Sequence, residues 1–370
     1  MRSGGMIVLA LSGLLLLGQV KTESDSSFTT LAAKASEARD ADRLDEAVAL
    51  YKKALALRPA WAEGWWYLGT LLYDQDAYAG AASAFQKVVE LRPEDGNAFA
   101  MLGLSEVKLG HNQDALAHLQ KGRQLGLSDD ALRNAAVYNE GVLLVESGAF
   151  QKAEETLDTL CRKGVDQPEL IMALGSAVLG IPASKVPPDD KEIRDMLWQA
   201  GWAEHFAAQR DQPAAALREY QKLVADFPKH RNVQFAYGRF LLEKHYDAEA
   251  LEAFKRELQN SPSHLLARLG IAGIDERTDP AAGLPYAEEA VKMSPKLAEG
   301  HYLLGMLLFD TGNTTRAITE LETAQRSTPD DPRVYFGLGR AYAQVHRNQD
   351  AAHARAMFVR LNKQGEEDQK

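Results

Sequence analysis

The chain has 370 residues, of which 45% are hydrophobic and 25% are charged, an ordinary composition for a globular protein. It has 52 acidic and 42 basic residues, a formal net charge of −10, and no basic run. Because a duplex-binding surface needs a concentrated excess of lysine and arginine, we expect no nucleic acid partner. The single cysteine, Cys161, excludes an internal disulfide and a thiolate metal cage.

Residues 1–24 have the outline of an export signal. Arg2 precedes an apolar run of 12 residues from Met6 to Leu17, and polar residues follow it. A membrane-spanning helix needs about 20 residues, so the run is too short to be an ordinary one. A charged start, a short apolar core and a polar exit are typical of a secretory signal, although no A-x-A cleavage site follows. We expect 1–24 to be a signal peptide or a short N-terminal anchor, and the chain to be exported, periplasmic or secreted.

The remainder of the chain is periodic. Prolines recur at a constant interval at 59 and 93, at 228 and 262, and at 295 and 329. Alanines repeat with the same spacing at 47, 81 and 115, at 216 and 250, and at 317 and 351. A fixed period of about 34 residues indicates stacked units, each of which buries its apolar face only against its neighbours.

Each unit reads as two short helices joined by a turn. In the first half, apolar and small residues lie at i, i+3, i+4 and i+7, as at Trp65, Leu68, Gly69 and Leu72. Small residues such as Gly69 and Ala81 allow two helices to approach closely. Turns such as 74–76 carry helix stop and cap residues. The prolines fall between units, where the missing N–H interrupts no helix.

These residues resemble the tetratricopeptide repeat. Segment 62–95 matches the family pattern W-x2-L-G-x2-Y…A-x3-F…P, with leucine in place of tyrosine, at Trp65, Leu68, Gly69, Leu72, Ala81, Phe85 and Pro93. Further copies occupy 96–129, 298–331 and 332–361, and weaker ones begin near residues 28, 134, 197, 231 and 265. The resemblance covers residues 28 to about 361. It implies an all-α fold, a right-handed α-solenoid of about ten helical hairpins, of the exported bacterial type.

The period is interrupted near 181–190. Ala153 and Ala216 lie closer together in the sequence than two regular units would place them. Segment 181–190 contains three prolines, which exclude a continuous helix. We therefore divide the chain into an N-terminal stack at 28–180, a Pro-rich loop at 181–190, a C-terminal stack at 191–361 and a charged tail at 362–370. The spacing leaves open whether a long helix at about 191–210 closes the fifth unit or opens the sixth.

The sequence lacks the common catalytic motifs. It contains no G-x-S-x-G, no Walker sequence and no Gly-rich phosphate loop. A helical-toroid enzyme acting on polysaccharide would need two facing carboxylates, but Glu63 and Glu299, at equivalent places, lie seven repeats apart. We expect no enzymatic activity, no cofactor and no metal site.

The resemblance implies a protein-binding role for the concave face, where first helices of successive units hold extended peptides. One residue after the tryptophan of the motif, this face has aromatic residues at Trp66, Tyr138, Phe235, Tyr302 and Phe336, and four residues later it has Arg239 and Arg340. The alternative is that these rings serve packing between repeats. Since aromatic and arginine side chains dominate protein interfaces, we expect these residues to form a groove for a partner.

The kind of partner is less defined. The places that hold a C-terminal carboxylate in chaperone-binding members are occupied here by Ala32, Ser36 and Tyr67, so that clamp is missing. We expect a scaffold or adaptor that holds a protein or peptide in or beyond the cell envelope. A periplasmic assembly factor for envelope proteins is the alternative, and the helical-toroid enzyme is the alternative from a different class. Contact with a membrane is expected only through the N-terminal segment.

Overall fold

The structure, a computed structural model, describes residues 25–367, and all regular secondary structure in that range is helical. The expected all-α solenoid is confirmed. The apolar run Met6–Leu17, expected as a signal or anchor, lies outside the described residues. The chain divides into two compact units, the first comprising residues up to Ala177 with Ile181–Pro187, and the second comprising Val178–Gly180 with the residues from Pro188 onward.

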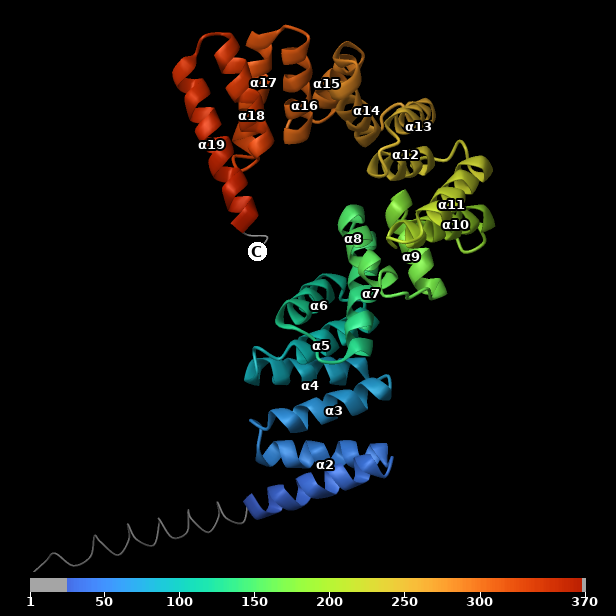
Figure 1. Cartoon of the computed structure of the whole chain (residues 1–370). Coiled ribbons are helices and arrows are strands. Elements are labelled where there is room, and N and C mark those ends of the chain that lie inside the picture. The colour runs from blue at the N-terminus through green and yellow to red at the C-terminus, as the bar shows by residue number, and fades with distance from the viewer. Residues whose placement is uncertain (1–24, 368–370) are drawn as a thin grey trace, which may run out of the picture. The chain divides into compact units, whose positions relative to one another are not determined.

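The helices of the first unit follow one another with short turns (Figure 1). After a helix over 25–40 they are α2 (Leu44–Leu57), α3 (Ala62–Asp74), α4 (Tyr78–Leu91), α5 (Gly96–Leu109), α6 (Asn112–Leu125), α7 (Asp130–Glu146), α8 (Phe150–Cys161) and most of α9 (Pro168–Leu179). Within this unit α3 packs on α4, α5 on α6 and α7 on α8, which are the expected hairpins.

The second unit contains five hairpins. Its helices are α10 (Lys191–Ala207), α11 (Pro213–Asp226), α12 (Val233–Glu243), α13 (Asp247–Asn260), α14 (Leu265–Thr278), α15 (Pro280–Met293), α16 (Ala298–Asp310), α17 (Thr314–Ser327), α18 (Pro332–Gln344) and α19 (Asn348–Glu367). Each even-numbered helix packs on the helix that follows it. Because α10 packs on α11, the long helix opens the sixth repeat. Since α19 runs to Glu367, residues 362–367 of the expected tail are helical.

The interruption after α9 contains a short 3-10 turn, η1 (Ala183–Lys185), in place of a second helix. Glu146, at the end of α7, fixes this turn. Its carboxylate accepts hydrogen bonds from the Ser184 hydroxyl at 2.5 Å and from the Ser184 backbone N–H at 3.2 Å. The segment therefore packs on the first unit as a loop with defined contacts.

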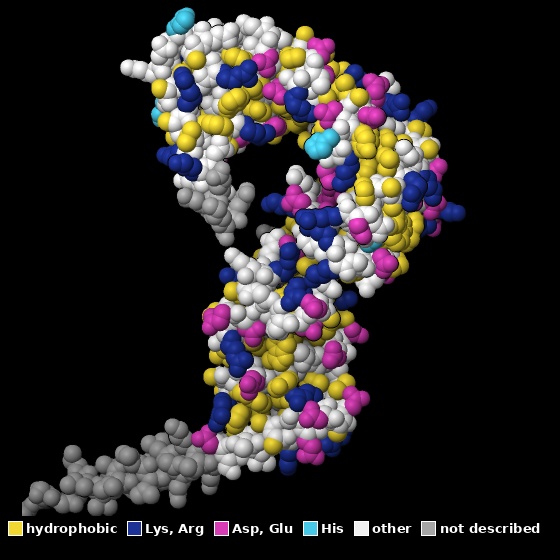
Figure 2. All heavy atoms as spheres, in the orientation of Figure 1, with side chains coloured by type: hydrophobic (Ala, Val, Ile, Leu, Met, Phe, Trp, Pro, Cys, Tyr) yellow, Lys and Arg dark blue, Asp and Glu magenta, His cyan; other side chains and the backbone are white. Residues whose placement is uncertain are grey.

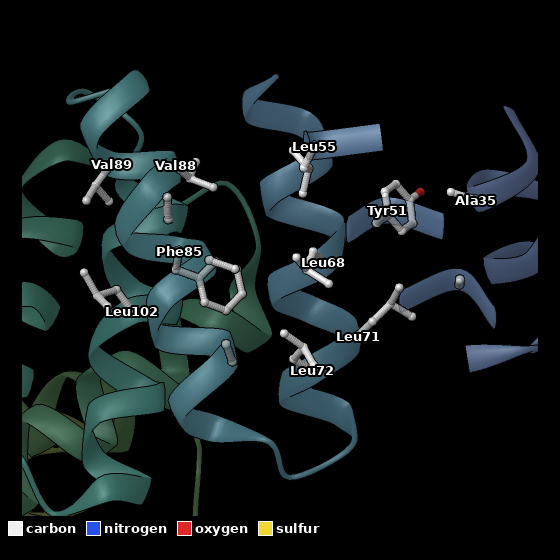
Figure 3. Packing of buried hydrophobic residues seen from close by; sticks show 14 of the residues in the cluster. Ala35, Tyr51, Leu55, Leu68, Leu71, Leu72, Phe85, Val88, Val89 and Leu102 are labelled. Carbon is white, nitrogen blue, oxygen red and sulfur yellow. The ribbon is translucent and has the colours of Figure 1, made fainter. Parts of the chain in front are cut away.

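The motif residues of the second repeat form the core that their spacing predicts (Figure 3). Leu68 of α3 and Ala81 and Phe85 of α4 are buried, and in the figure Leu68 and Leu72 face Phe85 across the hairpin. Gly69 allows this approach, since a Cβ at that position would lie 2.8 Å from the Phe85 ring. Pro93 is exposed in the turn between α4 and α5, outside both helices.

A recurring hydrogen bond joins the first helix of a repeat to the turn before it. Trp65 Nε1 donates to the carbonyl oxygen of Pro59 at 2.7 Å. At the equivalent place, His301 Nε2 donates to Pro295 O at 3.0 Å, and the Tyr335 hydroxyl donates to Pro329 O at 2.8 Å. Three different ring donors therefore occupy the same place in their repeats, and each donates to the proline carbonyl oxygen of the turn before its helix.

A buried polar network surrounds the start of α12. The carboxylate of Glu257 accepts from the backbone N–H groups of Asn232 at 2.9 Å and Phe235 at 3.2 Å. His264 Nε2 donates to Asn232 Oδ1 at 2.9 Å, while its Nδ1 accepts from Ala267 N–H at 3.1 Å and so caps α14. These bonds fix His264 as a neutral ring, because Nδ1 is needed as an acceptor.

This network predicts a loss of stability in mild acid. Burial lowers the pKa of His264 to about 4, with Arg231 and Arg268 acting in the same direction. A lowered histidine pKa means that the stabilisation is present above the ordinary value of 6.5 and is lost as pH falls towards the folded value. At pH 5 the histidine is mostly protonated in the unfolded chain but mostly neutral in the folded one. The free energy of unfolding of the second unit should therefore be about 2 kcal/mol lower at pH 5 than at pH 7.

The control for this prediction is His264→Asn, since asparagine can cap α14 and does not titrate. Burial raises the pKa of Glu257, which favours the folded state as pH falls and so opposes the histidine effect. The measurement is urea denaturation of both proteins at pH 7 and pH 5. Wild type should lose more stability than the variant, and equal losses would contradict the role of His264.

Candidate functional site

Four of the five first helices in the second unit, α12, α14, α16 and α18, lie on the inner side of its curve, and α13, α15 and α17 lie outside (Figure 1). The predicted groove residues are divided between the units. Trp66 and Tyr138 are on α3 and α7 of the first unit, whereas the second unit carries Phe235 and Arg239 on α12, Tyr302 on α16, and Phe336 and Arg340 on α18.

The two rings of the first unit are partly packed. Trp66 is half-buried and meets the buried Phe85 edge-on, with ring centroids 5.5 Å apart. Tyr138 is also half-buried, and this burial raises the pKa of its hydroxyl. Both residues therefore contribute to repeat packing as well as to the surface.

Phe235 is held by its neighbours. Its ring centroid lies 4.6 Å from that of His264 and 5.8 Å from that of Phe254. The guanidinium carbon of Arg239, one helical turn further on, lies 5.9 Å from the Phe235 ring. The ring is half-buried, with an arginine beside it.

Phe336 is the most accessible ring of the predicted set. It is 48% exposed, although its ring lies 5.6 Å from that of Phe358 on α19. The guanidinium carbon of Arg340 lies 5.7 Å from the Phe336 ring and 4.6 Å from the ring of Phe309 on α16. Arg340 also donates to Asp310 at 3.3 Å.

Arg333, which the sequence analysis missed, has the same arrangement two turns earlier on α18. It donates to Glu299 at 2.8 Å, and its guanidinium carbon lies 4.8 Å from the Tyr302 ring. Asp331 accepts from it as well, and these bonds raise the pKa of Arg333. The signal that could have found this contact is the separation of Glu299 and Arg333 by one repeat period, which places opposite charges at equivalent positions of adjacent repeats.

The inner face is therefore a mixed surface rather than a purely apolar one. Burial, and then the charge of Asp310, raises the pKa of Glu276 on α14. Burial, and then Glu276, raises the pKa of Tyr302. Figure 2 shows hydrophobic side chains together with basic and acidic ones along the inner rim of this unit.

The carboxylates considered for catalysis are both near arginines. The Glu63 carboxylate oxygen Oε1 lies 3.9 Å from Nη2 of Arg92, and the Glu299 carboxylate forms an ion pair with Arg333. In residues 25–367, no group of three or more His, Cys, Asp and Glu side chains is arranged to hold a metal ion. None of the helices in that range has both the length and the apolar character needed to span a membrane.

Comparison with known families agrees with this repeat architecture. The model of the tetratricopeptide repeat family matches residues 32–96, 100–168, 201–264, 275–332 and 302–357. The chain belongs to the tetratricopeptide repeat family. Members of this family generally bind protein partners.

Individual relatives are distant. Protein O-mannosyl-transferase TMTC3 of Homo sapiens is 22% identical over 277 residues, a match that covers 74% of this chain and 27% of that protein. Among solved structures, a crystal structure of MamA has a TM-score of 0.39 and 18% identity, covering 42% of this chain and 92% of that one. MamA 41-end from Desulfovibrio magneticus RS-1 has a TM-score of 0.39 and 20% identity, covering 42% and 88%. This chain therefore spans about a quarter of the length of TMTC3.

Proposed function

We propose that the chain is a non-catalytic scaffold or adaptor that holds a partner protein, through a peptide, on the inner faces of its first helices. The observation that carries this proposal is Phe336, a large apolar ring that is 48% exposed on a first helix, with Arg340 beside it. The few residues that dominate the binding energy of protein interfaces are enriched in aromatic and arginine side chains. An exposed pair on a family surface that binds peptides is therefore the best supported contact site.

An enzymatic role has weaker support. Mannosyl transfer appears in the name of TMTC3, but the match covers only 27% of that protein. On this chain the two carboxylates at equivalent repeat positions, Glu63 and Glu299, lie beside arginines. Each carboxylate is therefore engaged with an arginine, whereas a glycosidase needs two carboxylates that face each other.

The location is proposed from the sequence pattern of residues 1–24 alone. We place the chain in or beyond the cell envelope, with this segment as a cleaved signal or an uncleaved anchor. A periplasmic assembly factor for envelope proteins is one form that the scaffold could take. N-terminal sequencing tests the location, since a start between residues 21 and 27 indicates cleavage, and a start at Met1 in the membrane fraction indicates an anchor.

The scaffold proposal predicts that Phe336→Ala weakens partner binding. Removing an interface aromatic should cost about 2 kcal/mol, or about thirtyfold in affinity. The free energy of unfolding should change less, because the ring is half exposed. The measurement is capture of a partner from envelope extracts, followed by titration of that purified partner with wild type and the variant.

The matched control is Tyr246→Ala. Tyr246 is 49% exposed but lies in the turn between α12 and α13, so its removal should leave binding unchanged. If Phe336→Ala melts early and still binds the partner as wild type does, the ring is a packing residue and the proposed surface is wrong.

A further inference from the structure

The helix α10 lacks a contact that every later repeat of the second unit has. The first helices α12, α14, α16 and α18 each follow a second helix and pack on it. In the fifth repeat, η1 and the Pro-rich loop stand where the second helix before α10 would be. One face of α10 is therefore without the helix that covers the equivalent face in the other repeats.

Three aromatic side chains, spaced four residues apart, form a row along α10. Trp198 is 38% exposed, and Trp202 and Phe206 are half-buried. The Trp198 and Trp202 rings meet edge-on with centroids 5.9 Å apart, and the Trp202 and Phe206 rings are stacked at 5.5 Å. The hairpin partner α11 packs on the opposite side of α10, where the Tyr220 hydroxyl donates to Glu204 at 2.6 Å. An end helix of a repeat stack normally has a polar outer face, so an aromatic row indicates a contact surface.

The next repeat shows what covers this face. Ala236 and Phe240 of α12 lie one repeat period after Trp202 and Phe206, and both are buried. The Phe240 ring is stacked on that of Tyr220, with centroids 4.9 Å apart. Tyr220 belongs to α11, the second helix of the repeat before. The element that covers the equivalent row is therefore an α-helix.

The pair α15 and α16 shows which residues of the covering helix make the contact. A Cβ on Gly283 of α15 would lie 3.2 Å from Leu307, which is the equivalent of Phe206 on α16. Near the other end, a Cβ on Gly300 of α16 would lie 3.4 Å from Val291 of α15. Ala287, midway between these contacts, is buried in the same cluster as Leu307. The covering helix thus runs antiparallel and faces its neighbour with a row of small residues spaced four apart.

The tryptophan rings on α10 and one nearby charge specify this pattern further. Because tryptophan is larger than the leucines of α16, a helix can approach the α10 row closely only where its own side chains are small. Asp195 is exposed one turn before Trp198. The last turn of an antiparallel helix would lie beside it, and a basic residue there also suits the helix dipole. In α15, Lys292 has this place.

We propose that the α10 row of Trp198, Trp202 and Phe206 binds an amphipathic α-helix of a partner protein, in the place of the second helix that the fifth repeat lacks. The bound helix has small residues at every fourth position and a lysine or arginine in its last turn. This surface is separate from the inner-face residues of the proposed scaffold function, so the inference goes beyond that function.

The test uses a peptide with the α15 sequence, residues 279–294, which has this pattern. A helix of 14 residues is only marginally stable alone, and Pro285 lies inside it. A hydrocarbon staple that replaces Pro285 and Glu289, which are both exposed, removes the proline and holds the helix. The labelled peptide is titrated with the full chain and followed by fluorescence anisotropy.

Variants of α10 locate the binding site. Trp202→Ala should weaken binding of the stapled peptide about thirtyfold, and the more exposed Trp198→Ala about tenfold. The matched control is Leu266→Ala, since Leu266 is 53% exposed on α14 at the place equivalent to Trp198, and it should leave binding unchanged. Melting curves check that each variant folds. Unchanged affinity in both tryptophan variants would contradict the proposal.

Variants of the peptide test its chemistry. A peptide with Ala287→Leu should bind about tenfold more weakly, because the larger side chain meets the tryptophan row. On the full chain, Asp195→Lys should weaken the original peptide about threefold and strengthen a peptide with Lys292→Glu. If Ala287→Leu binds as tightly as the original peptide, the row does not select small residues and the proposed pattern is wrong.

The inner face provides the last control. Phe336→Ala should bind the stapled peptide as wild type does, because the ring lies on α18. If wild type does not bind the peptide at all, the proposal is wrong. Light scattering then tests the other occupant, since a dimer that Trp202→Ala dissociates would show that a second copy of the chain covers the row. Loss of partner capture by Phe336→Ala would still support the scaffold function in that case.

Discussion

Replacing Phe254 with alanine should lower the free energy of unfolding of the second unit by about 3–5 kcal/mol. The ring is 1% exposed on α13 and fills the space between two repeats. A Cβ on Gly238 of α12 or on Gly270 of α14 would lie 2.6 Å from its atoms, so both helices lie directly against the ring. Alanine would leave a cavity that these helices can close only by moving together.

The measurement is chemical denaturation of the full chain, with Phe254→Leu as the control. Leucine retains most of the apolar volume and should cost roughly 1 kcal/mol. Because repeat stability passes between neighbours, the alanine variant should also broaden the transition as α12–α13 and α14–α15 lose their coupling. A loss below about 1 kcal/mol for Phe254→Ala would contradict the packing described here.

The hairpins could be predicted because their determinants are local. Small residues at a fixed period, such as Gly69 and Ala81, mark where helices approach closely, and the prolines mark where they end. The pairing of α10 could not be predicted, since spacing does not show which neighbour a helix packs on. Trp65, His301 and Tyr335 each donate a hydrogen bond to the carbonyl oxygen of the preceding proline. The family motif names only tryptophan at this place, so it does not predict that histidine and tyrosine make the same bond.

The groove residues could be placed on their helices but not ranked by exposure, because part of what covers Phe235 and Tyr302 comes from the next repeat. Phe235 is covered by His264, which precedes α14, and Tyr302 is covered by Arg333 of α18. Phe336 lies in the last hairpin that the structure describes and stays 48% exposed. The position in the repeat is the same for these three rings, so it does not predict their different exposure.

Arg340 illustrates a second limit of the sequence. Its position predicts a basic group facing a partner, but its pairing depends on side-chain geometry across two helices. Asp310, at the end of α16, meets it at 3.3 Å, and the Phe309 ring lies beside the guanidinium. The charge on the inner face is therefore partly balanced before any ligand binds.

In the first unit, Gly122→Ala should lower the free energy of unfolding by about 3 kcal/mol, the upper end of the cost of overpacking. A Cβ on Gly122 of α6 would lie 2.8 Å from the carbonyl oxygen of Gly96 and 2.9 Å from the backbone nitrogen of Ala100. Both obstacles are backbone atoms of α5, which cannot rotate away as a side chain can. The two helices of the hairpin would have to separate.

The sign of this effect is what makes the test sharp, because alanine in an exposed helix is normally stabilising relative to glycine by about 1 kcal/mol. The control is Gly365→Ala on α19, where a Cβ would meet nothing within 4 Å and the substitution should stabilise the helix. Denaturant melting of both variants gives the comparison. If Gly122→Ala were as stable as wild type, α5 and α6 could not be in the backbone contact that the structure shows, since helix propensity alone is too small to offset it.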